Sequence, residues 1–211
     1  MASMVINLWV AKKINEKLKV AENDLFLGAI APDISKCLGE SKIVSHFQKT
    51  NDNIPILSDF LSKYKLNNNF LLGYYIHLYT DYIWFKYFLT NIASNNNIKL
   101  LDGTIIDYDE EKFVELIYND YTNLNIQIID EYNLDLKLFY NKLPEIDNII
   151  QEISIDKLDV LLDKLGLIIE NSKEKKQLIF NIENIKKFIG LAVELTLSNL
   201  NDIQNYNKKS D

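Results

Sequence analysis

The chain has 211 residues, is 47% hydrophobic and carries a net charge of −7, which suits a globular protein with a sizeable core. Every one of its 23 basic residues is a lysine, so the composition disfavours a broad nucleic-acid-binding face and excludes guanidinium clamps on phosphate. The single cysteine, Cys37, excludes an intrachain disulfide.

The first third of the chain is predicted to form short helices. Apolar residues at helical spacing predict a helix over residues 5–20, and Pro32 ends a second helix over 25–30 that Asn23 or Asp24 would cap. A loop is expected over 34–40. Short helices are expected over 41–49 and 55–64, the latter with Pro55 in its first turn.

The stretch from 70 to 93 predicts the longest buried helix, because almost all of its residues are apolar or aromatic. The three asparagines at 67–69 precede it and are expected to cap it. The pattern then breaks, and Asp102-Gly103 predicts the turn of a short hairpin within residues 98–106.

Helical spacing returns in the second half of the chain. The expected helices cover residues 109–132, 134–143, a segment opening at Pro144, 158–169 behind a cap at Ser154 or Asp156, and 172–204 with a break near Asn181. The polar tail 205–211 is expected to fray. The sequence therefore predicts an all-α fold, with residues 1–211 as a single multi-helix domain.

Neither the apolar run near the N-terminus nor the apolar stretch in the middle of the chain predicts a membrane protein. The apolar run 4–11 is interrupted by Asn7 and followed by two lysines, unlike a signal peptide. The stretch 70–89 is the nearest to a spanning helix, but it carries His77, Asp81 and Lys86. We expect no transmembrane segment and a cytoplasmic location.

His77 and Asp81 are four residues apart, so they share one face of the predicted 70–93 helix. In such apolar surroundings they are either a private hydrogen-bonded pair or half of a metal site. The only other histidine, His46, lies thirteen residues after Asp33, which follows Pro32. Two imidazoles and two carboxylates form a plausible ligand set for zinc or another divalent ion.

The segments that contain these residues are similar to the zinc-dependent phospholipase C family, whose helical fold is shared with the S1/P1-type nucleases. The resemblance lies in residues 25–33 (LFLGAIAPD), 45–47 (SHF) and 70–81 (FLLGYYIHLYTD). It covers roughly residues 5–84, and beyond residue 90 only the helical character matches. It implies a phospholipase C/P1 nuclease-like fold and hydrolysis of a phosphoester, either a small molecule or a phospholipid.

The resemblance also implies a ligand set. Family members carry three zinc ions, and the deepest is held by the counterparts of Asp33, His46, His77 and Asp81. In the family, the counterpart of Asp81 bridges to a second ion. This ion is also held by a processed N-terminus and by a histidine in the first helix, where this chain has Asn7. The histidines of the third ion are missing, so one zinc ion is expected here, with further ions or another divalent metal left open.

Three further residues are considered as replacement ligands. Asp120 and Glu194 are single acids beside apolar helix faces, and each is otherwise a solvated or capping carboxylate. Asn7 is otherwise a buried polar residue hydrogen-bonded near the site, since amide oxygens suit harder ions than zinc. The sequence leaves two hypotheses: a metal-dependent phosphoester hydrolase, or a non-catalytic, metal-stabilised binding domain on the same fold.

Overall fold

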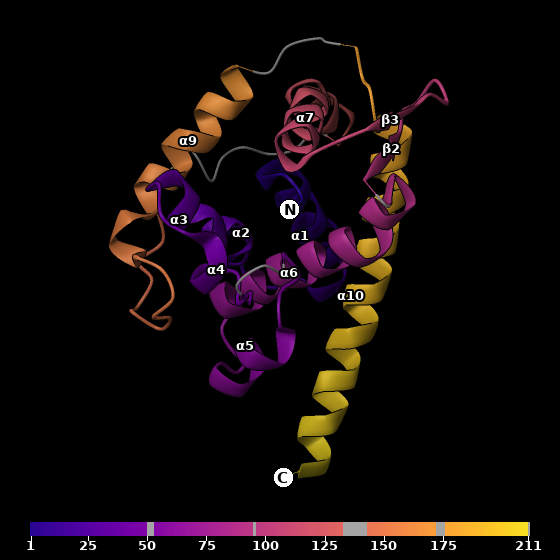
Figure 1. The fold of residues 1–211 in the computed structure, drawn as a ribbon. Coiled ribbons are helices and arrows are strands. Elements are labelled where there is room, and N and C mark those ends of the chain that lie inside the picture. Colours follow the sequence, from indigo (N-terminus) through magenta and orange to yellow (C-terminus); the bar gives the residue numbers. More distant parts are fainter. Residues whose placement is uncertain (50–52, 95, 133–142, 172–175, 211) are drawn as a thin grey trace.

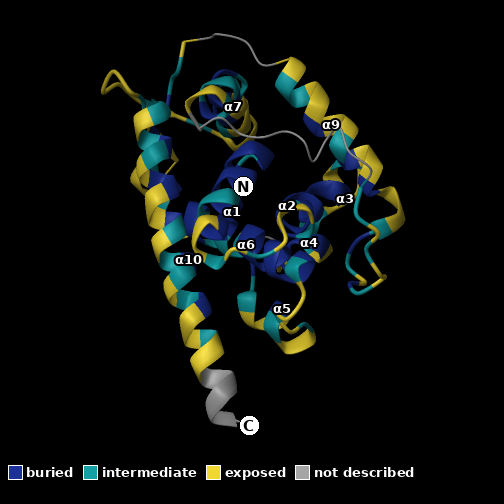
Figure 2. Cartoon of the chain, turned by 180° about the vertical axis from the view of Figure 1, so that it is seen from behind, coloured by how far each residue is buried: buried dark blue, intermediate teal, exposed yellow. Residues whose placement is uncertain are grey.

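The computed structural model describes residues 1–49, 53–94, 96–132, 143–171 and 176–210. Its centre is made by three helices, α1 (Met4–Leu18), α2 (Glu22–Ile30) and α6 (Asn69–Ile83). Figure 2 shows that buried residues gather on these three helices, whereas the outer helices have one buried and one exposed face. The prediction of an all-α protein is confirmed.

The crossing of α2 and α6 is unusually close, because a glycine on each helix faces the backbone of the other. A Cβ atom on Gly28 would lie 2.1 Å from the carbonyl oxygen of Phe70, and one on Gly73 would lie 2.0 Å from that of Leu25. Any side chain at either position would force the helices apart. This contact fixes the position of α6 relative to the segment that follows α2.

Short helical turns fill the segment after α2. They are η1 (Ala31–Asp33), α3 (Ile34–Cys37), α4 (Lys42–Ser45) and α5 (Leu57–Lys63). The loop predicted over 34–40 is therefore partly helical. The predicted caps of α2 are wrong, since this helix begins at Glu22, before Asn23 and Asp24. The cap of α4 is Ser41, whose side chain accepts a hydrogen bond from the Ile43 N–H.

The N-terminus of α6 is capped as predicted. The side chain of Asn68 accepts hydrogen bonds from the N–H groups of Phe70 and Leu71. The helix does not continue regularly to residue 93. It changes at Trp84 into a π-helical turn, η2 (Trp84–Phe88), and then into a 3₁₀ turn, η3 (Leu89–Asn91). In the π turn the ring centroids of Trp84 and Phe88 lie 4.4 Å apart against the core. Hydrophobic periodicity does not predict this turn.

The predicted hairpin is present within a small antiparallel sheet. Its strands are β1 (Ala93–Ser94), β2 (Asn97–Lys99) and β3 (Ile105–Asp107), in the order β1-β2-β3. Ile98, which is fully buried, pairs with Ile106. Gly103 turns the chain with a φ of 89°, which glycine adopts without strain.

The outer helices are α7 (Glu110–Tyr132), α9 (Leu158–Glu170), which follows the 3₁₀ turn η4 (Ile155–Lys157), and α10 (Ile182–Ser210). Figure 1 shows α10 along one side of the molecule and α9 on the opposite side. The helix predicted over 172–204 begins only at Ile182, because residues 176–181 are not helical. The side chains of Asn181 and Asn184 each accept a hydrogen bond from the other's backbone N–H and so open α10. The backbone of 205–210, predicted to fray, belongs to this helix.

The helix predicted to open at Pro144 is wrong, because residues 143–154 are irregular. Glu152 holds this segment against α5 by accepting hydrogen bonds from Lys63 Nζ at 2.7 Å and from the Tyr64 hydroxyl at 2.5 Å. The helix predicted over 134–143 falls almost wholly outside the described residues. No helix among the described residues is long and apolar enough to cross a membrane.

Candidate metal centre

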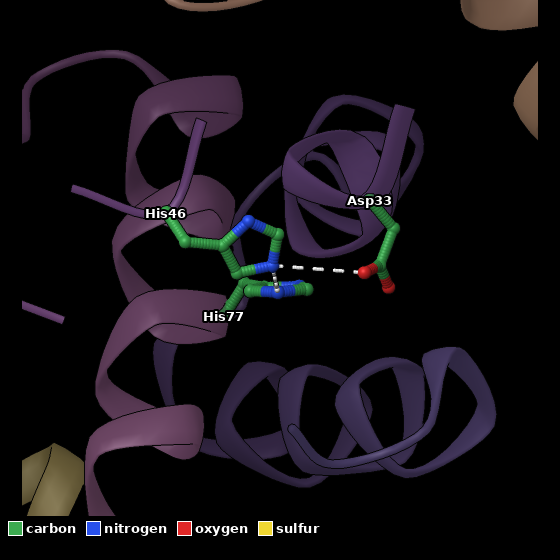
Figure 3. A group of neighbouring side chains, drawn as sticks. All are labelled: Asp33, His46 and His77. Atoms are coloured by element: carbon green, nitrogen blue, oxygen red, sulfur yellow. Dashed lines mark hydrogen bonds and ion pairs between the residues drawn. The ribbon is translucent and has the colours of Figure 1, made fainter. Parts of the chain in front are cut away.

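Four polar side chains meet inside the protein where α6 crosses the turns that follow α2. Asp33 ends η1, His46 directly follows α4, and His77 and Asp81 lie one turn apart on α6. Both histidines and Asp81 are 0% exposed, and Asp33 is 2% exposed. The structure thus brings together all four residues of the predicted site, three of which are drawn in Figure 3.

The facing atoms of these side chains are close. The Nε2 atoms of His46 and His77 are 3.3 Å apart, and Asp33 Oδ1 lies 3.6 Å from His46 Nε2. Potential ligand atoms of Asp33, His46 and His77 all fall within 4.8 Å of one another. Asp81 Oδ2 completes the cluster at 3.8 Å from His46 Nε2 and 3.7 Å from His77 Nε2.

The hydrogen bonds behind the rings fix which imidazole nitrogen carries the proton. His77 Nδ1 lies 2.7 Å from the carbonyl oxygen of Ala29, which can only accept, so Nδ1 is protonated. Ser45 Oγ donates its proton to the Lys42 carbonyl oxygen, so it accepts from His46 Nδ1 at 3.0 Å. In the neutral state both Nε2 atoms therefore present lone pairs to the centre of the cluster.

The carboxylates present lone pairs to the same point. Asp33 Oδ1 and Asp81 Oδ2 are buried and have no hydrogen-bond partner among the described residues. The other oxygen of Asp81, Oδ1, accepts a hydrogen bond from the Ala2 N–H at 2.9 Å. Four lone pairs that face one another with no hydrogen atom between them repel. Buried polar atoms without a hydrogen-bond partner also destabilise the folded state. A cation at their centre removes both costs.

The pKa values fit a site that is deprotonated at neutral pH. Burial lowers the pKa of His77 below its ordinary value, although Asp81 and Asp33 favour its charged form. Burial acts to raise the pKa of Asp33, but the two neighbouring imidazoles hold it below its usual value. Neutral imidazole and ionised carboxylate are the forms that bind metal.

The distances also fit a tetrahedral ion. Zinc bonds to histidine nitrogen and carboxylate oxygen are about 2.0–2.2 Å, so neighbouring ligand atoms around one ion lie about 3.3–3.6 Å apart. The four separations given above run from 3.3 to 3.8 Å, and the ligand atoms of Asp33, His46 and His77 all lie within 4.8 Å of one another, so small side-chain shifts would bring them to these distances. The residues therefore fit a single divalent ion, with two nitrogen and two oxygen ligands.

The three additional candidates lie in other environments. Asp120 is fully buried, but its carboxylate accepts hydrogen bonds from the N–H groups of Leu178, Ile179 and Phe180. Glu194 is exposed on α10. Asn7 is fully buried on α1, and neither atom of its amide has a hydrogen-bond partner among the described residues. The structure thus leaves Asn7 as the candidate with unused ligand capacity.

The N-terminal segment lies close to the site, since the Ala2 N–H contacts Asp81. The sequence did not predict this proximity. Burial lowers the pKa of the Met1 amine to about 5, although the charge of Asp81 opposes this shift. The Met1 carbonyl oxygen accepts a hydrogen bond from the Tyr121 hydroxyl at 2.6 Å. Sequence reasoning also missed Ser45, whose position next to His46 was its only signal.

No protein-family model, curated protein or solved structure matches the chain in comparisons with known proteins. What the site can do is therefore argued from its own residues.

Proposed function

We propose that this chain binds one divalent cation, with Zn²⁺ as the best fit, at Asp33, His46, His77 and Asp81, and uses this centre in the hydrolysis of phosphoesters. The observation that carries the metal site is the convergence of two imidazole lone pairs and two unpartnered carboxylate oxygens on one point. The activity is proposed from the resemblance of these segments to zinc-dependent phospholipase C.

The ligand set suits both the charge and the burial of the site. Two carboxylates balance the charge of a divalent ion, which offsets the cost of burying them. A divalent ion at such a site supplies Lewis acidity and lowers the pKa of bound water. Ala29 and Ser45 hold the histidines in the ligating tautomer, and Ala2 orients Asp81.

A cavity that could take a substrate lies beside the turn that precedes His46. Its volume is about 880 Å³, and its lining contains two lysines, Lys42 and Lys49, together with three acids, Glu40, Asp109 and Glu110. Lys42 is the first residue of the helical turn that precedes His46. Burial lowers the pKa of its amine, whereas the charges of Asp81 and Asp33 act to raise it. In a chain without arginine, lysine is the side chain that can supply a cation to a phosphoryl group.

One observation favours the second function, a non-catalytic binding domain stabilised by its metal. The four ligands are almost completely buried, and zinc sites with four protein ligands are typically structural, because catalytic sites keep one position open. The two functions share the same ion and differ in whether a substrate reaches it.

Metal analysis followed by a turnover assay separates these functions. The purified chain is reconstituted with Zn²⁺, dialysed and analysed by mass spectrometry, beside Asp81→Asn and the control Glu194→Gln. We expect one ion per chain in wild type and in the control, and less than one tenth of this in Asp81→Asn. Wild type without a stoichiometric ion would overturn the metal site.

Turnover is then measured on bis(p-nitrophenyl) phosphate and p-nitrophenyl phosphate. The hydrolase predicts release of p-nitrophenol by wild type and Glu194→Gln and loss of it in Asp81→Asn. A loaded protein that releases none, but unfolds when a chelator removes the ion, would instead be a metal-stabilised domain.

A further inference from the structure

The peptide group that joins Met1 and Ala2 lies between Tyr121 and Asp81. Its carbonyl oxygen accepts a hydrogen bond from the Tyr121 hydroxyl at 2.6 Å, and its N–H donates to Asp81 Oδ1 at 2.9 Å. Both hydrogen bonds therefore run through one planar amide. A donor on the carbonyl polarises the amide and strengthens its N–H as a donor.

Tyr121 lies on α7, and this helix contacts the N-terminal segment at a second point. Ser3 Oγ donates to Asn125 Oδ1 at 3.2 Å, and Asn125 lies one turn after Tyr121 on the same face of α7. Ser3 also caps α1, since its Oγ accepts from the Ile6 N–H. The segment 1–3 is thus fastened to α7 on one side and joined to α1 on the other.

Tyr121 is rigidly placed for this role. It is only 6% exposed, and its ring packs against Trp84 and Phe180 at centroid distances of 5.9 and 5.7 Å. Phe180 is held there because its N–H donates to Asp120. Burial, followed by the charges of Asp81 and Asp33, raises the pKa of the Tyr121 hydroxyl well above its ordinary value, so the hydroxyl remains a donor.

We infer that Tyr121 is a positioning residue of the metal centre, acting on Asp81 through the Met1–Ala2 peptide group. With Oδ1 held by the Ala2 N–H, the other oxygen, Oδ2, stays directed at the two histidines. Without this hydrogen bond the carboxylate is free to rotate and to bind the ion less well. The inference rests on the proposed metal site, and it gives α7 a part in that site.

The first test measures Zn²⁺ affinity by competition with a chromophoric chelator. Tyr121→Phe keeps the ring and removes only the hydroxyl, and we expect its affinity to fall about 10-fold, at the lower end of outer-shell effects. Tyr75→Phe is the matched control, because Tyr75 is also buried and its hydroxyl donates to Asn199 instead. An unchanged affinity in Tyr121→Phe, or an equal loss in the control, would overturn the inference.

A second variant removes the other hydrogen bond of the same peptide. Ala2→Pro lacks the N–H that Asp81 accepts, and its affinity should fall at least as far as that of Tyr121→Phe. Because both changes act through one amide, the double variant should lose no more than Ala2→Pro alone. Losses that multiply in the double variant would show that Tyr121 acts elsewhere. Far-UV circular dichroism confirms that each variant is folded.

A third measurement needs no metal and so keeps this inference separate from the metal site. Hydrogen exchange of the Ala2 amide, followed by NMR in the metal-free protein, should be slowed at least about 10-fold relative to an unstructured peptide. The protection should fall in Tyr121→Phe and stay in Tyr75→Phe. An Ala2 amide in wild type that exchanges like a free peptide would overturn the inference even if zinc binds.

Discussion

The Nε2 atoms of His46 and His77 face each other across 3.3 Å in a fully buried part of the protein. Each ring has its Nδ1 proton engaged, one by Ser45 and the other by Ala29. Neither neutral ring can therefore donate to the other. This relationship favours a metal site over the alternative of a private His–Asp pair, because His77 and Asp81 alone would not need a second imidazole at this distance.

Removing one imidazole should abolish tight metal binding. In His77→Ala we expect a loss of zinc affinity greater than the roughly 10–100-fold typical of outer-shell changes, because a direct ligand is lost. Isothermal titration with Zn²⁺ measures it. Tyr75→Phe, on the same helix two residues earlier, serves as control. Equal affinities in wild type and His77→Ala would mean that zinc binds elsewhere.

Asp120 should act on stability rather than on metal binding. Its carboxylate accepts three backbone N–H groups of the 178–180 segment, and hydrogen bonds to a buried charge are among the stronger ones. Asp120→Asn should lower the free energy of unfolding by about 2–4 kcal/mol, as measured by urea denaturation. If instead stability is kept and zinc is lost, Asp120 would be a ligand, as considered from the sequence.

The close crossing of α2 and α6 should tolerate no side chain. In Gly73→Ala the added Cβ meets the Leu25 carbonyl oxygen at 2.0 Å, and we expect a loss of about 3 kcal/mol or more from this overpacking. Gly190→Ala is the matched control on α10, where a Cβ meets nothing within 4 Å. That change should stabilise the protein by about 0.5–1 kcal/mol. Similar unfolding midpoints for the two variants would contradict the crossing.

The metal-free protein should lose stability in acid in two steps. The pKa of His77 is lowered in the folded state, so the unfolded chain takes up this proton more readily, and stability falls as the pH drops below about 6.5. The pKa of Asp33 is also lowered, so its contribution is present above about 3.9 and is lost below that pH. Urea unfolding with a chelator present, at pH 8 and then at steps down to pH 3, measures both. A free energy of unfolding that rises from pH 7 to pH 5 would contradict the first step.

The sequence pattern predicts which residues share one face of a helix better than it predicts how two helices pack on each other. The spacing of His77 and Asp81 placed both on one face of α6, as the structure shows. Periodicity cannot bring Asp33 and His46 to that face, because their approach depends on how η1 and α4 pack on α6. The resemblance grouped these two residues with His77 and Asp81, and the four side chains lie together in the structure.

Other features depended on contacts that no local pattern carries. The π turn begins at Trp84, whose ring packs against Phe180 and Phe188, two rings that are distant in the sequence. The role of Tyr121 depends on a hydrogen bond to Met1, a separation of 120 residues. Its helix was predicted nearly to the residue, but nothing in the spacing of α7 indicated that one tyrosine on it bonds to the peptide group that contacts Asp81.

The glycine contact between α2 and α6 also bears on the order in which the molecule is built. It packs Gly28 against Phe70 and Gly73 against Leu25, and the four proposed ligands lie between Asp33 and Asp81, ahead of α7 and α10 in the sequence. Contacts of short sequence separation form early, before long loops are closed. We expect zinc present during refolding to speed the docking of α6 on α2. The helices α7 and α10 would then close over a centre that has already captured its ion.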